Sequence, residues 1–181
     1  MSGMTWVAAV TVKLPYPVSA NRYWRTRVVL PSMDKIAAAF KEGGLKGLCT
    51  FVAEHAFVNT YVSTEAKNYK EAVGWLLRNA GVRRVLEGRV RVDLQLHPHC
   101  PKDWRTRARK DPLWWADTVQ RLDLDNARKV VTDALKGIAI VDDCWVWKDT
   151  GEVMEPDEGV EACVVVRISK ALKDNPQGAL L

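Results

Sequence analysis

Two acidic pairs, Asp123 with Asp125 and Asp142 with Asp143, flank a segment that contains Lys129. Asp123 and Asp125 are two residues apart, and on extended backbone such side chains point to the same face. Carboxylates on one face repel each other unless a cation lies between them, and Mg²⁺ or Mn²⁺ prefers such hard oxygen ligands. A divalent ion held there can activate water and stabilise a phosphoryl transition state. The spacing therefore predicts the metal site of a phosphodiesterase, with an N-cap and a surface acid as the simpler alternative.

The other members of this segment suggest supporting roles. Lys129 follows Asp125 by four residues, so on a helix the two share a face. As a point charge, Lys129 could stabilise the pentavalent phosphate or the leaving oxygen. The alternative is an ordinary surface ion pair, worth about 0.3–0.5 kcal/mol. Of the later pair, we expect Asp143 to complete the metal site and Asp142 to form the turn, with the reverse assignment left open.

A basic, tryptophan-rich segment leads directly into the first acidic pair. It contains Trp104, Trp114 and Trp115. Its candidate DNA-binding cations are Lys102, Arg105, Arg107, Arg109 and Arg121. Basic residues interleaved with aromatic residues can neutralise phosphates and stack on unpaired bases, although a solvated loop with tryptophans packed on the core is the alternative.

A second polar and basic loop lies near the N-terminus, where Asn21, Arg22 and Arg25 are candidate phosphate contacts. The neighbouring Tyr23 and Trp24 fit either a core position or a stacking role. The formal net charge of +5 suits a polyanionic partner.

The composition is that of one packed domain. The chain has 181 residues, of which 48% are hydrophobic. Its apolar runs are far shorter than a membrane span, and its first residues lack the pattern of a secretory signal. We therefore expect a cytoplasmic protein with no membrane partner. The four cysteines include no CxxC pair, so zinc is not favoured at His97-Pro98-His99-Cys100.

Hydrophobic periodicity predicts six main elements in the order strand, helix, strand, helix, strand, strand. Their expected ranges are 5–14, 62–80, 89–96, 126–136, 145–154 and 160–168, with a loop at 19–25. Residues 30–58 are interpreted as an insertion with helical stretches at 33–41 and 50–57, and residues 174–181 as a flexible tail. This order predicts a single small α/β (α+β) domain over residues 1–173, with a mixed sheet and helices mainly on one face. If the helix between the acidic pairs packs on that sheet, both pairs can converge near its N-terminal end.

Four blocks of the sequence carry a family resemblance. They are Leu14-Pro15-Tyr16-Pro17 with Asn21-Arg22-Tyr23; Val62-Ser63 with Tyr69-Lys70; Asp123-Leu124-Asp125-Asn126 with Lys129 and Asp133-Ala134-Leu135; and Asp142-Asp143 with Trp145-Val146. Together they resemble the RusA family of Holliday junction resolvases, small endodeoxyribonucleases common in phages and prophages.

The resemblance implies a homodimer that binds a four-way DNA junction and makes paired nicks with Mg²⁺ or Mn²⁺, in a bacterial host cell. It implies that Asp123, Asp125 and Asp143 carry metal binding and catalysis, with Lys129 near the scissile phosphate. The segments 30–58 and 102–121 are both longer than usual for the family, so cleavage specificity does not carry over.

Two other functions compete with a junction endonuclease. The insertion and the long basic loop also suit a protein that binds branched DNA without cutting it. A metal-dependent phosphohydrolase of nucleotides is a weaker alternative, because the sequence has no glycine loop that could cradle phosphates.

Overall fold

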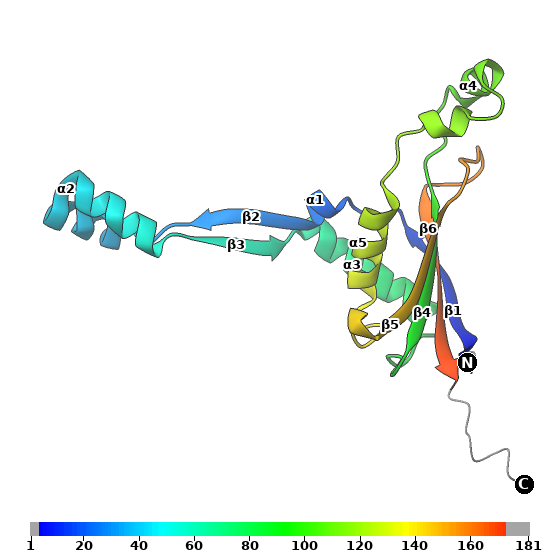
Figure 1. Cartoon of the computed structure of the whole chain (residues 1–181), viewed down its shortest axis with the longest axis horizontal. Helices are drawn as coiled ribbons and strands as arrows, with labels where there is room; N and C mark the ends of the chain where they lie inside the picture. Colours follow the sequence, from blue (N-terminus) through cyan, green and yellow to red (C-terminus); the bar gives the residue numbers. More distant parts are fainter. Residues whose placement is uncertain (1–3, 173–181) are drawn as a thin grey trace, which may run out of the picture.

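A four-stranded mixed sheet forms the body of the protein (Figure 1). The computed structural model describes residues 4–172. The strands are β1 (Thr5–Pro15), β4 (Val90–His97), β5 (Val146–Val153) and β6 (Cys163–Leu172), in the spatial order β1-β6-β4-β5. Strand β6 pairs antiparallel with β1 and β4, whereas β4 and β5 are parallel. The expected mixed α+β sheet is confirmed, with β6 in its interior.

Two helices cover one face of this sheet. Helix α3 (Thr64–Asn79) begins where Ser63 caps it, since the Ser63 hydroxyl accepts a hydrogen bond from the Ala66 amide at 3.2 Å. Helix α5 (Leu124–Leu135) follows the first acidic pair. Apolar residues of α5 recur at helical spacing and are fully buried against the strands. They are Ala127, Val130, Val131, Ala134 and Leu135.

The segment interpreted as a loop and an insertion forms a long arm that leaves the body (Figure 1). After the short helix α1 (Ala20–Tyr23), strand β2 (Trp24–Val29) pairs antiparallel with β3 (Phe57–Val62). Helix α2 (Met33–His55) lies at the far end and reverses at Gly44, whose φ of 58° is a conformation that glycine adopts readily. The helical stretch expected at 50–57 ends at His55, and the expected loop at 19–25 ends in a strand. Both strands of the arm were missed.

The arm has no core of its own. No residue of α2 is buried, and the large side chains of Val28, Phe57 and Val58 are exposed. A ribbon with solvent on both faces shows no clear alternation of apolar and polar residues, which explains why the sequence pattern did not reveal it. No helix among residues 4–172 is long and apolar enough to cross a membrane, and the expected tail lies outside the described residues.

One glycine sets how closely α5 lies on the sheet. A Cβ at Gly151 of β5 would lie 2.9 Å from Leu124 Cδ2 and 3.0 Å from Arg128 Nη2. These contacts are tighter than van der Waals packing allows, so a larger residue would displace the Leu124 and Arg128 side chains that pack the first turn of α5 on β5.

We expect Gly151→Ala to lower the free energy of unfolding by about 1–3 kcal/mol, because the Leu124 and Arg128 side chains must move. Urea denaturation followed by circular dichroism measures this change. Gly159→Ala is the matched control, since a Cβ at Gly159 meets nothing within 4 Å. Equal stability of the two variants would contradict this account of the packing.

Candidate metal and nucleic-acid site

Asp123 begins helix α5 as its N-cap. Its Oδ1 accepts a hydrogen bond from the Asn126 backbone amide at 2.8 Å, and its Oδ2 accepts one from Asn126 Nδ2 at 2.6 Å. The cap satisfies an amide that has no partner within the helix. A carboxylate has about four acceptor sites on its two oxygens, so capping leaves Asp123 able to bind a cation as well.

Asp125 lies in the first turn of α5 with its side chain 92% exposed. Arg128 lies 3.4 Å from it and also reaches Asp149 of β5, with 3.0 Å between Arg128 Nε and Asp149 Oδ2. That second contact is an ion pair by distance only, because the Nε–H makes no hydrogen bond. Asp149 lies within β5, beside the first acidic pair. Only the pairing of β5 with β4 brings it there, so no local sequence signal marks it.

The later acidic pair lies at the opposite end of α5. Lys136, the C-cap of α5, places its Nζ 3.4 Å from both Asp142 Oδ2 and Asp143 Oδ1. Asp142 also accepts a hydrogen bond from the Cys144 amide at 3.3 Å and begins the short helix η2 (Asp143–Trp145). The neighbouring Asp143 side chain, this amide and the Lys136 ammonium together lower the pKa of Asp142 to about 2.

The length of α5 separates the two pairs. Its 12 residues span about 18 Å at the usual rise of a helix. The expected convergence of both pairs near the N-terminal end therefore does not occur in the single chain. The cause is the direction of β5. It starts beside the C-terminal end of α5, where η2 lies, and runs toward the N-terminal end of α5, where Asp149 and Gly151 lie.

The donor chemistry at the N-terminal end suits a magnesium ion. Mg²⁺ keeps several waters in proteins and is commonly bound through one or two carboxylates together with substrate phosphates. Asp123 and Asp125 supply two such carboxylates, both open to solvent. Among residues 4–172, no group of three or more His, Cys, Asp or Glu side chains is arranged to hold a metal.

A second charged cluster lies along the side of α5 that faces the start of the arm. The Lys129 ammonium lies 4.7 Å from the centre of the Trp24 ring, a cation–π contact. Asp133, one turn further on, has a raised pKa because it is partly buried and because Asp143 is negatively charged, while Lys136, Lys129 and Lys70 oppose the rise. Lys129 and Asp143 thus share Asp133 as a neighbour. Sequence reasoning used Asp133 only as part of a motif and gave Lys70 no role.

Some cations of the basic segment are paired with carboxylates of the chain, whereas others are not. The segment folds as α4 (Trp104–Lys110) and the short helix η1 (Trp115–Thr118). Arg107 lies within 3.1 Å of both Asp103 oxygens and donates to the Thr118 carbonyl, and Arg105 pairs with Glu158 at 2.8 Å. Within the described chain, Lys102, Arg109 and Arg121 are exposed and make no ion pair.

The tryptophans of this segment pack mainly on one another. The ring centres of Trp104 and Trp115 are 5.8 Å apart, and neither residue is buried. Trp114 is 66% exposed beside the exposed Leu113. The segment projects from the body at α4 (Figure 1), so these aromatic side chains do not belong to the main core.

The candidate phosphate contacts of the expected loop 19–25 lie on two different elements. Asn21 and Arg22 lie on α1, where Arg22 pairs with Glu65 of α3 at 2.7 Å. Arg25 lies on β2 and is exposed. Tyr23 is buried in the core, whereas Trp24 is half-buried beneath Lys129.

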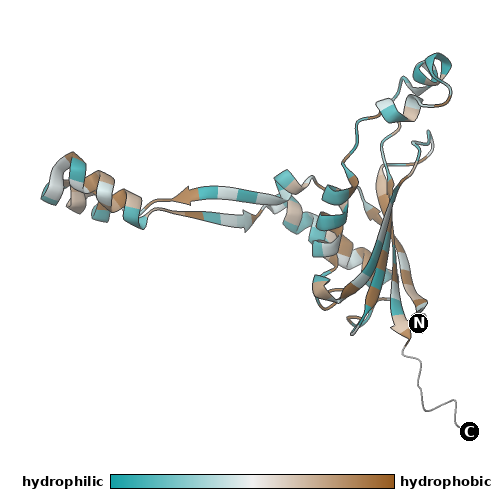
Figure 2. Ribbon diagram, viewed as in Figure 1, coloured by the Kyte–Doolittle hydropathy of each residue, from teal (hydrophilic) through white to brown (hydrophobic). Residues whose placement is uncertain are grey.

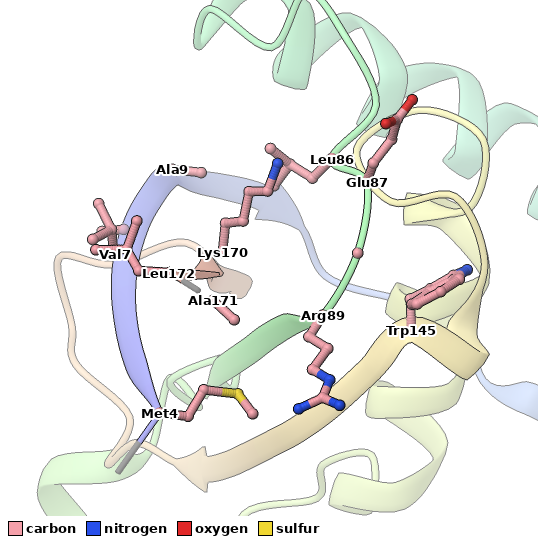
Figure 3. Close-up of a pocket in the computed structure, with 12 residues that line it drawn as sticks. Met4, Val7, Ala9, Leu86, Glu87, Arg89, Trp145, Lys170, Ala171 and Leu172 are labelled. Atoms are coloured by element: carbon pink, nitrogen blue, oxygen red, sulfur yellow. The ribbon is translucent and has the colours of Figure 1, made fainter. Parts of the chain in front are cut away.

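A hollow of about 1050 Å³ opens at the end of the sheet where β1 begins and β6 ends (Figure 3). Its lining is mainly apolar, with Met4, Val7, Leu86 and Trp145 contributed by three separate segments. None of the sequence-predicted site residues lines it. The candidate chemistry therefore lies on the exposed sides of α5 and not in a deep pocket.

Comparison with protein families identifies the family of this chain. The family model described as endodeoxyribonuclease RusA matches residues 50–169, which contain both acidic pairs, Lys129 and the basic segment. No curated protein matches the chain. Nucleases of this family act on Holliday junctions and generally depend on a divalent metal ion. With two thirds of its length matched, the chain belongs to the RusA family of endodeoxyribonucleases.

Proposed function

We propose that this protein resolves four-way DNA junctions by paired, metal-dependent nicks. The observation that supports the proposal most directly is helix α5, which carries Asp123, Asp125 and Lys129 within its first two turns. The carboxylates stand at the N-terminal end of the helix, where unpaired amides also favour the approach of a phosphate.

In this proposal Asp123 and Asp125 would hold Mg²⁺ or Mn²⁺, which when bound would supply an activated water. Asp123 keeps its orientation through its two hydrogen bonds to Asn126. Lys129 moves from the Trp24 ring to the scissile phosphate, where its charge stabilises the transition state. Asp143, or Asp142 in its place, is a further functional acid at the C-terminal end of α5, apart from the metal site, and it acts after DNA binding has drawn Lys136 away.

Paired nicks on a four-way junction require two active sites, and a twofold homodimer supplies them. The exposed cations Arg25, Lys102, Arg109 and Arg121 contact phosphates, together with Asn21. Arg22, Arg105 and Arg107 contribute less, because each is already paired with a carboxylate of its own chain.

Asp125→Asn should lower the rate of junction cleavage by at least about 100-fold, because it removes a charged metal ligand. Junction binding and the melting temperature should be unchanged, since this side chain is exposed. A labelled synthetic four-way junction incubated with Mg²⁺, Mn²⁺ or EDTA measures cleavage, with linear duplex as the substrate control. Glu71→Gln, an exposed acid of α3, is the matched variant and should cut normally. Wild-type cutting by Asp125→Asn, or by the wild type in EDTA, would refute the metal assignment.

Asp143→Asn and Asp142→Asn separate the roles of the later pair. We expect Asp143→Asn to abolish cutting, whereas Asp142→Asn should leave most activity, because an asparagine side chain still accepts the hydrogen bond from the Cys144 amide. Single-turnover cleavage at saturating protein measures both. The reverse order would make Asp142 the functional acid.

Arg109→Ala and Arg105→Ala test the division among the basic residues. Loss of a free cation that contacts a phosphate should reduce the salt dependence of junction affinity by about one unit of slope, so we expect this for Arg109→Ala. Arg105→Ala should change the slope less, because Arg105 is paired with Glu158. Binding isotherms at several salt concentrations give the slopes, and equal slopes for the two variants would contradict the division.

A second candidate function is binding of branched DNA without cleavage. The contact of Lys136 with both later acids favours it, because this ammonium neutralises them. Tight, junction-selective binding with no nick in either Mg²⁺ or Mn²⁺ would establish this function in place of the nuclease.

A further inference from the structure

The helical tip of the arm, residues 33–55, presents one apolar face that nothing in the described chain covers. The tip consists of two helical halves that meet at Gly44. They run antiparallel, because the chain leaves the ribbon at Val29 and returns at its paired residue Phe57. The two halves touch closely where Gly47 approaches the Ala39 carbonyl, with 3.0 Å to a Cβ built on Gly47.

Half-buried residues mark where the two halves face each other. They are Ile36 and Ala39 in the first half and Gly47, Leu48, Phe51 and Val52 in the second, so that Val52 lies at the edge of the contact. Each half also carries a second apolar stripe. Most of its residues come one position later in the sequence than a residue of the contact line. The stripes are Met33, Ala37, Phe40 and Leu45, Cys49, Val52, both at spacings of four and three residues.

These two stripes lie on the same side of the tip. Each residue turns a helix by about 100°, so the equal displacement rotates both stripes by the same angle from the contact line. Because the halves are antiparallel, equal rotations carry both stripes to one broad face. Met33 is 76% exposed, Phe40 50% and Leu45 72%, so this apolar face is open, and Figure 2 shows apolar residues along α2.

The opposite face of the tip is polar. It carries Lys35, Glu42, Thr50 and Glu54, with Ala38 between them. The tip is therefore amphipathic as a unit, which is typical of helices that bury one side against a partner.

The charge of the tip argues against DNA as that partner. Lys35, Lys41 and Lys46 balance Asp34, Glu42 and Glu54, so the tip has no net attraction for a polyanion. The ribbon beneath it differs, since Arg25 and Arg27 are the only charged residues of β2 and β3. DNA therefore suits the ribbon, and a protein surface suits the tip.

We propose that the apolar face of the tip packs against the same face of a second copy, so that two hairpins form a four-helix bundle between the two arms. A twofold arrangement is self-complementary, because the same patch is used twice. Asp34, Lys41 and Lys46 flank the face with both signs of charge, which allows opposite charges to meet across the twofold axis. A four-helix bundle buries one apolar stripe on each of its helices, which the tip offers.

The need for a second copy rests in part on the proposed function, since paired nicks require two sites. The bundle would join the two bodies through their arms and leave both α5 surfaces free for DNA. In Figure 1 the tip lies at the far end of the arm from α5, so the contact does not occlude the candidate site.

The test uses the full chain without DNA. We expect sedimentation velocity to show a dimer for the wild type, and Phe40→Glu/Leu45→Glu to raise the dimer dissociation constant at least about 30-fold, because two large exposed apolar anchors are lost from each copy. Ala38→Glu/Thr50→Glu places the same two charges on the polar face and should dimerise as the wild type does. Circular dichroism melts confirm that both variants are folded.

A monomeric wild type, or equal dimerisation of the two double variants, would overturn the proposal. A monomeric wild type that recruits another protein through this face would assign the face to that protein. Junction cleavage is measured separately: a dimer that dissociates only in Phe40→Glu/Leu45→Glu supports the tip contact even when no variant cuts DNA. A nuclease whose dimer is insensitive to both variants retains the proposed function and loses this contact.

Discussion

Burial of the apolar stripe of α5 against the sheet determines the direction of every charged side chain in the acidic motif. Ala127, Val130, Val131 and Ala134 have no exposed surface, so the helix cannot rotate without leaving apolar area in water. With that side fixed, Arg128 must face β5, Lys129 must face the start of the arm, and Asp125 must face solvent. The packing of a helix thereby sets the geometry of the charged surface around it.

Much of the body could be predicted because β1, β4, α3 and α5 have clear periods, whereas β6 is marked only by a run of apolar residues. Val10, Val12 and Leu14 alternate along β1, and α5 repeats its apolar residues at three and four positions. The arm could not be predicted in this way. Strands β2 and β3 pair residues that lie 28 to 38 positions apart in the chain, and neither strand has a core face to mark its period.

The sequence indicates which residues belong to the candidate site better than it indicates how those residues are arranged in space. Asp123, Asp125 and Lys129 belong to one helix, so their spacing alone places them. The position of the later pair depends on which way β5 runs beside α5, and this is a property of sheet pairing that local spacing does not contain. The pairing of Arg105 with Glu158 is equally non-local, which is why the basic segment could not be divided into free and paired cations from sequence.

The arm leaves and rejoins the body at directly paired residues, Trp24 and Val62. This pair closes the base of the arm. Next to it, the Ser63 amide donates a hydrogen bond to the Tyr23 carbonyl at 2.9 Å. The positions of the two ends of the arm are therefore fixed whatever the length of the arm. Segments of quite different size could occupy this position without a change in the sheet or in α5, so the length of the arm can vary while the body stays constant.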